Sequence, residues 1–181
     1  MTPVLRTLRY LRPAQVGHRL GRHVLAPWFA SSLYDRWCLA PDGEAAIVAV
    51  PPHLWPGDAA NGQRIRGGHI RLIGHDHPFA RPFDWQARGQ SLLWRFTLHY
   101  FEWLADLRDV EDGAVHARTL IGEWIEAHPR PGDIAWHPYP LSLRVYAWLC
   151  HAPLFLDGAD DDWRHRFVLS LDRQVRHLGR V

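Results

Sequence analysis

The amino-acid sequence predicts a mainly α fold, in which helices pair as antiparallel hairpins beside a small β-hairpin region near residues 45–74. From residue 91 onward, apolar side chains recur every three or four positions, which is the period of an amphipathic helix. Between residues 45 and 74, short β-branched runs are separated by Gly, Pro and His, as is typical of strands and turns. With 181 residues and 47% hydrophobic content, the chain is long enough to enclose one core.

Residues 1–88 are expected to form an N-terminal basic helical and short β region. Arginines among leucines predict a basic amphipathic helix in residues 1–22, which packs on its own domain or contacts an anionic membrane surface. AAIVAV at 45–50 predicts a short buried strand that stops at Pro51. QRIRGGHIRLIG predicts a hairpin that turns at Gly67 and Gly68.

Residues 89–181 are expected to contain four helices. The first covers 91–107, the second covers 114–127 and ends before Pro129, and the third starts near Pro140. The fourth follows the acidic stretch DGADDD, which suits a helix N-terminus. The predicted inward stripe of the first helix is Leu93, Phe96, Tyr100, Leu104 and Leu107, and that of the fourth is Arg164, Val168, Leu171, Val175 and Leu178.

Charge and motifs argue against several functions. The net charge is only +2, far from the strongly basic balance of a nucleic-acid-binding protein, so we expect no nucleic-acid partner. His69, His75, His77 and Asp76 could ligate Zn²⁺, but adjacent strand positions point to opposite faces, and we expect no metal and no cofactor. Neither a secretory signal nor a membrane span is visible, and the location stays unknown.

A set of aromatic and polar residues is the best candidate for a binding site. Flat rings can cover the apolar face of a sugar, and arginine can pair with a carboxylate through two hydrogen bonds. Each ring could equally be part of the core, with its polar atom bonded locally. The candidate substrate-binding residues are Trp94, His99, Trp136, Tyr139 and Arg144.

Three segments carry a family resemblance: FDWQ…LLWRFTLHYFEWLADL, LIGEWIEAHP and AWHPYPLSLRVYAWL. In order and spacing they resemble the N-terminal region of the heparinase II/III-like polysaccharide lyases. The resemblance covers about residues 79 to 178. It implies that residues 89–181 form an incomplete (α/α) toroid. It also implies β-elimination on uronic-acid-containing polysaccharides such as glycosaminoglycans.

The chain departs from that family where catalysis would occur. The family's catalytic Asn, Tyr and His belong to segments that have no counterpart here, and its β-sandwich part is also absent, so no catalytic residue can be assigned. We therefore expect the N-terminal portion of such a lyase, inactive by itself, with an acidic polysaccharide as partner. The alternative is a non-catalytic carbohydrate-binding or interaction module. Uncovered apolar helix faces would in addition favour self-association.

Overall fold

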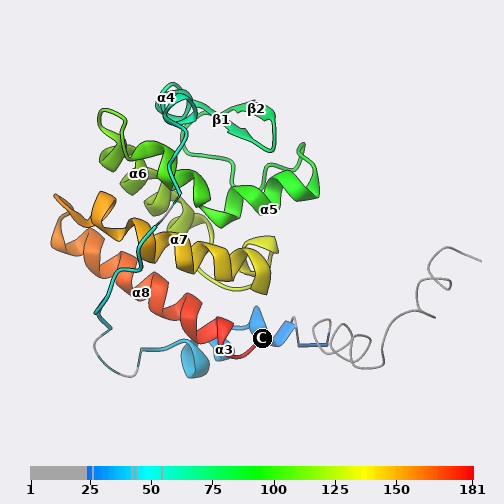
Figure 1. Cartoon of the computed structure of the whole chain (residues 1–181). Helices are drawn as coiled ribbons and strands as arrows, with labels where there is room; N and C mark the ends of the chain where they lie inside the picture. Colours follow the sequence, from blue (N-terminus) through cyan, green and yellow to red (C-terminus); the bar gives the residue numbers. More distant parts are fainter. Residues whose placement is uncertain (1–23, 26, 42, 44, 54) are drawn as a thin grey trace, which may run out of the picture.

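The computed structural model describes residues 24–25, 27–41, 43, 45–53 and 55–181, and it confirms a mainly helical fold with a small antiparallel hairpin. The basic helix expected in residues 1–22 lies outside the described residues. Figure 1 shows α5, α6, α7 and α8 stacked in layers, with α4 and the hairpin at one end and α3 at the other. The elements are α3 Ser32–Cys38, α4 Ala59–Arg66, β1 His69–Leu72, β2 His75–Pro78, α5 Leu92–Tyr100, the 3₁₀ helix η1 Glu102–Leu107, α6 Gly113–Ala127, the 3₁₀ helix η2 Ile134–Trp136, α7 Pro138–Leu156 and α8 Asp161–Leu178.

Side-chain caps determine where several helices begin. Ser91 Oγ accepts a hydrogen bond from the Trp94 amide at 3.2 Å, and Asp160 Oδ1 accepts one from the Trp163 amide at 2.7 Å. Each cap satisfies a backbone N–H that has no partner inside the helix and contributes about 1 kcal/mol. Helices are present in each of the four predicted segments, and α7 and α8 form an antiparallel pair across a short connection (Figure 1). Within the described residues, no helix combines the length and the apolar character that a membrane span requires.

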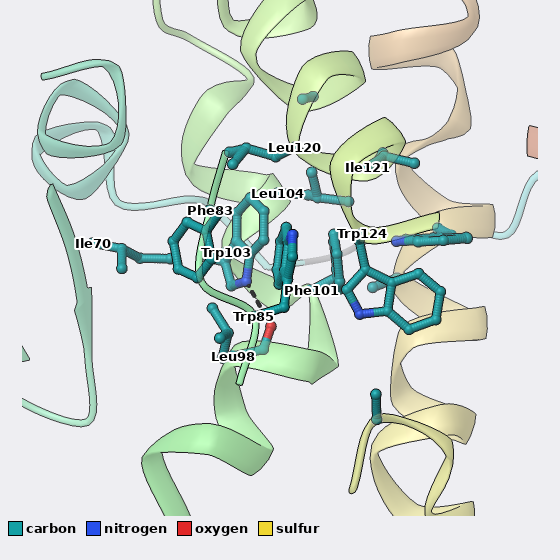
Figure 2. Packing of buried hydrophobic residues seen from close by; sticks show 14 of the residues in the cluster. Ile70, Phe83, Trp85, Leu98, Phe101, Trp103, Leu104, Leu120, Ile121 and Trp124 are labelled. Carbon is teal, nitrogen blue, oxygen red and sulfur yellow. Dashed lines mark hydrogen bonds between the residues drawn. The ribbon is translucent and has the colours of Figure 1, made fainter. Parts of the chain in front are cut away.

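The predicted continuous helix over 91–107 is wrong, because the chain breaks at Phe101. This residue has φ 61° and ψ 15°, the left-handed conformation, and it separates α5 from η1. Its ring is fully buried between Trp85, on which it stacks at 5.5 Å, and Trp124, which it meets edge-on at 6.1 Å (Figure 2). The backbone conformation costs about 1–3 kcal/mol, and burial of the aromatic ring offsets that cost.

The buried faces of α5 and α8 are rotated from the predicted stripes. In α5, Leu93 is exposed, and Trp94, Leu98 and His99 are buried. The other end of the predicted stripe is buried as predicted, at Tyr100, Leu104 and Leu107. In α8, Val175 is half exposed, and the buried residues are Phe167, Leu171, Gln174 and His177. Gln174 and His177 are polar, so a pattern based on apolar residues did not place them on the buried face.

The β region also differs from the prediction. Residues 45–50 belong to no strand, and Ile47 alone of the run is packed against the core cluster. Asp58 caps a helix, α4, so Gly67 and Gly68 end that helix and do not form the hairpin turn. The hairpin turns instead between Leu72 and His75, with Ile73 and Gly74 at positive φ. The division into regions 1–88 and 89–181 stays a prediction.

Substitution of Gly62 tests the close contact between α4 and η1. A Cβ at this position would overlap the carbonyl oxygen of Asp106, so we expect Gly62→Ala to lower the free energy of unfolding by about 1–3 kcal/mol. Gly122→Ala is the matched control within α6, because its Cβ would meet no atom closer than Trp163 Nε1 at 3.5 Å. That control should gain up to about 1 kcal/mol from helix propensity. Urea unfolding compares the two, and equal effects would refute the close packing of α4 on η1.

Candidate functional site

Arg144 is the most deeply buried charged side chain among the described residues, at 0% exposure. From α7, its Nε donates to Gln174 Oε1 of α8 at 2.7 Å, and its Nη1 donates to the carbonyl oxygens of Ala135 at 2.8 Å and His99 at 3.3 Å. Its guanidinium carbon lies 4.0 Å from the ring centroid of Trp124, a cation–π arrangement. Burial lowers the pKa of Arg144 well below its ordinary value, although the negative charge of Asp133 acts to raise it.

His99 is held as a neutral ring beside this arginine. Its Nδ1 accepts a hydrogen bond from Trp124 Nε1 at 3.1 Å, which assigns the lone pair to Nδ1. Burial, helped by the positive charge of Arg144, lowers the pKa of His99 from 6.5 to about 3. A histidine of this kind is uncharged at neutral pH and serves as a hydrogen-bond acceptor in the core.

His128 and Asp133 form a second buried pair next to the network. His128 Nδ1 lies 2.9 Å from Asp133 Oδ2, which also accepts from Gln86 Nε2 at 3.1 Å. Burial opposes ionisation of Asp133, but the hydrogen bond and electrostatic attraction of His128, together with the hydrogen bond from Gln86, outweigh it and lower its pKa to about 2. The ionised carboxylate therefore accepts from Nδ1–H of His128.

A cleft of about 220 Å³ opens beside this pair, between α6 and α8. Its apolar walls include Ile125, Trp163 and Leu169. Arg173 lines it as well but is bonded to Asp35 of α3 and to the Pro129 carbonyl oxygen. Arg166 also lines the cleft; it is 59% exposed and has only a loose contact with Glu126 at 3.8 Å. The cleft thus combines an apolar interior with Arg166 and Glu126, which carry opposite charges, at its edge.

The structure separates the five predicted site residues. Trp94, His99 and Arg144 are at most 1% exposed and contact only other parts of the chain, whereas Tyr139 is 58% exposed beside Tyr100. Trp136 is 4% exposed and lines the cleft. His99, Arg144 and Trp136 come together around Trp124, and Trp94 lies apart, against His77. Their role in substrate binding stays a prediction.

Sequence reasoning missed other members of the site. Gln174 and His177 are three residues apart on the same face as Phe167 and Leu171, a spacing that indicates polar groups on a buried helix face. No local sequence pattern predicted that His128, Asp133 or Arg166 belongs to the site. In the part of the chain that the structure describes, no group of three or more His, Cys, Asp or Glu could hold a metal ion.

One relative supplies the comparison with known proteins. The chain is 33% identical over 160 residues to FtsZ-localized protein C of Caulobacter vibrioides (strain NA1000 / CB15N). The alignment covers 86% of the chain and 27% of that relative, so the chain spans about a quarter of the relative's length. No protein-family model and no solved structure matches the chain.

The resemblance to heparinase II/III-like polysaccharide lyases is therefore wrong. The relative found over most of the chain has a name that refers to FtsZ, and nothing in the comparisons points to a lyase. Three predictions that depended on this resemblance are wrong as well: β-elimination on uronic-acid polysaccharides, glycosaminoglycan binding and an acidic polysaccharide as partner. The physical reason lies in the matching segments, whose Trp, Phe and Leu are mostly buried. Such residues report helix packing more than chemistry.

Arg144→Ala should lower the free energy of unfolding by about 3–5 kcal/mol, because it leaves three buried oxygen acceptors without a donor. The exposed Arg166→Ala is the control and should change stability by less than about 0.5 kcal/mol. Chemical denaturation followed by tryptophan fluorescence measures both. A loss of similar size in the two variants would contradict the structural role of Arg144.

His99 should make stability depend on pH. The unfolded chain binds a proton at His99 below about pH 6.5, and the folded chain does so only near pH 3, so acidification between these values favours unfolding. His99→Gln keeps an acceptor but cannot titrate. In this pH window, the substitution should reduce the slope of the unfolding free energy against pH by up to about 1.4 kcal/mol per pH unit. Urea unfolding of both proteins at about pH 7 and about pH 5 measures the loss of unfolding free energy on acidification. An equal loss in the wild-type chain and the His99→Gln variant would refute the prediction.

Proposed function

We propose that the chain is a non-catalytic interaction module that associates with FtsZ or with an assembly that contains FtsZ. The observation that carries the proposal is the 33% identity to FtsZ-localized protein C over 86% of the chain. An alignment of this extent includes most of the helical core. The relative's name describes the relative itself, and the same association for this chain is our inference.

The internal bonding of the core supports a role without catalysis. Arg144 Nε and Nη1 and His99 Nδ1 bond to Gln174, Trp124 and backbone carbonyls, whereas Arg144 Nη2 has no partner among the described residues. Bonds of this kind fix the geometry of the helices, which supports a structural role for these two residues. Recognition is then left to the surface, where the cleft between α6 and α8 is apolar inside and has Arg166 and Glu126 at its edge.

The test is direct binding between the 181-residue chain and purified FtsZ of Caulobacter vibrioides. We expect saturable binding in biolayer interferometry with a Kd of about 1–100 μM, a range common for transient protein contacts. Serum albumin and heparin on separate sensors are controls for nonspecific and for charge-driven attachment. Binding to FtsZ no stronger than to albumin would contradict the proposed function.

A further inference from the structure

Residues 45–53, which we call the strap, cross α7 and α8 without belonging to a helix or a strand. In Figure 1 the strap is part of the blue-green trace that runs past α8 and α7 toward α4. No backbone group of the strap is hydrogen-bonded to another residue that the structure describes. The strap is therefore held in place by its side chains.

The strap covers an apolar groove of α7 and α8 but does not fill it. Ile47 packs against the core cluster, whereas the neighbouring Val48 is 95% exposed. A space of about 320 Å³ is lined on one side by residues 45–49 and on the other by the groove. Atoms that face a gap have no contact partners on that side, so the strap gains little dispersion energy there. The groove residues are Leu149 of α7 and Val168, Leu171, Asp172 and Val175 of α8.

His53 holds the other end of the strap, through contacts with His151 of α7 and with Arg108, which follows η1. The rings of His53 and His151 lie 4.4 Å apart, and Nη2 of Arg108 lies 3.5 Å from Nδ1 of His53. Nη2 of Arg108 also lies 3.4 Å from Nδ1 of His151. Because a guanidinium group can only donate, this contact requires a lone pair on Nδ1 of His151. The arrangement therefore requires a neutral His151 ring.

The surroundings of His151 oppose a positive charge on its ring. The residue is 2% exposed, and burial is the largest cause that lowers its pKa from 6.5 to about 4. The other causes are His53 of the strap and Arg108, and both lower this pKa as well. Nε2 of His151 is buried and has no hydrogen-bond partner among the described residues, so no acceptor at this atom would offset the charge.

We propose that the strap is a pH-sensitive switch, in which protonation of His151 on mild acidification repels Arg108, breaks the contact with His53 and releases residues 45–53 from the groove of α7 and α8. Release lets water reach the charged His151 ring and uncovers the apolar groove. It stops at residues 57–58, where the chain is fixed on η1. A Cβ at Gly57 would overlap the carbonyl oxygen of Ala105, and the amide of Asp58 donates to Asp106 Oδ1 at 2.7 Å.

Acid favours the open strap because the open state binds more protons. The pKa of His151 is about 4 with the strap closed, and once water reaches the ring we expect it to approach the ordinary value of 6.5. Between these two values the open state is the more protonated one, so lowering the pH shifts the equilibrium toward it. From about pH 7.5 to about pH 5.5, the ratio of open to closed molecules should rise by up to about tenfold.

The experiment is methyl NMR on the whole chain, with ¹³C in the δ1 methyl groups of isoleucine. Relaxation dispersion and saturation transfer at Ile47, assigned through Ile47→Val, give the population of the open strap at each pH. That population should grow by up to about tenfold on acidification, while the signal of Ile121, which is buried in α6, shows no exchange. An open population that is equal at the two pH values would overturn the proposal. So would a joint response of Ile47 and Ile121, because it would mean that the whole chain unfolds.

Two variants test whether His151 is the group that responds to acid. His151→Asn keeps an acceptor for Arg108 but cannot be protonated, so the open population should become independent of pH. His165→Asn removes an exposed histidine of α8 and is the matched control, which should keep the wild-type response. His53→Ala changes only the strap, so the core stays intact. It should open the strap more at about pH 7.5 and reduce the response to acid.

Thermal melting checks that each variant is folded, and His53→Ala decides the matter if His151→Asn is not. A wild-type pH response in His53→Ala, or in a folded His151→Asn, would refute the role of these histidines. A response that is lost in His165→Asn as well would refute it too, because the effect would then not be specific to the strap.

Discussion

Arg144 of α7 joins α8, α5, η2 and α6 through one buried guanidinium group. Such a group is tolerated in the core only where acceptors meet it in suitable directions, because desolvating a charge costs several kcal/mol. Gln174, two backbone carbonyl oxygens and the face of Trp124 supply those acceptors. The helices therefore have to keep the positions that hold these groups, and this requirement fixes the arrangement on which the surface depends.

Around that group, the core aromatic rings are chiefly structural. Phe101 adopts a left-handed backbone because its ring fits between Trp85 and Trp124. His99 stays neutral because burial, helped by the positive charge of Arg144, lowers its pKa. The network reaches the surface at one place, where His128 lines the cleft between α6 and α8 and its ring lies 5.2 Å from that of His99. The buried network thus borders the cleft directly.

The sequence predicted those features that depend on local physics. Apolar periodicity and the acidic stretch before α8 were sufficient to predict that helices form in these segments. The helix break at Phe101 could not be predicted, since its positive φ is imposed by rings from distant segments. The buried face of α8 was not predicted correctly because two of its residues, Gln174 and His177, are polar. The site was less predictable still. Trp94, His99 and Arg144 looked suited to binding, but only their partners, 9 to 45 residues away for Arg144, determine that they are internal.

The burial of Arg144 can be tested most directly by hydrogen exchange at its Nε–H group, followed by ¹⁵N NMR on the whole chain. If the guanidinium group is held in the core by Gln174 Oε1, its Nε–H signal should exchange only through global unfolding, as slowly as the amides of α7. The exposed Arg88 provides the reference for a free arginine. Exchange of Arg144 at the rate of Arg88 would show that the group is open to solvent and would contradict the account.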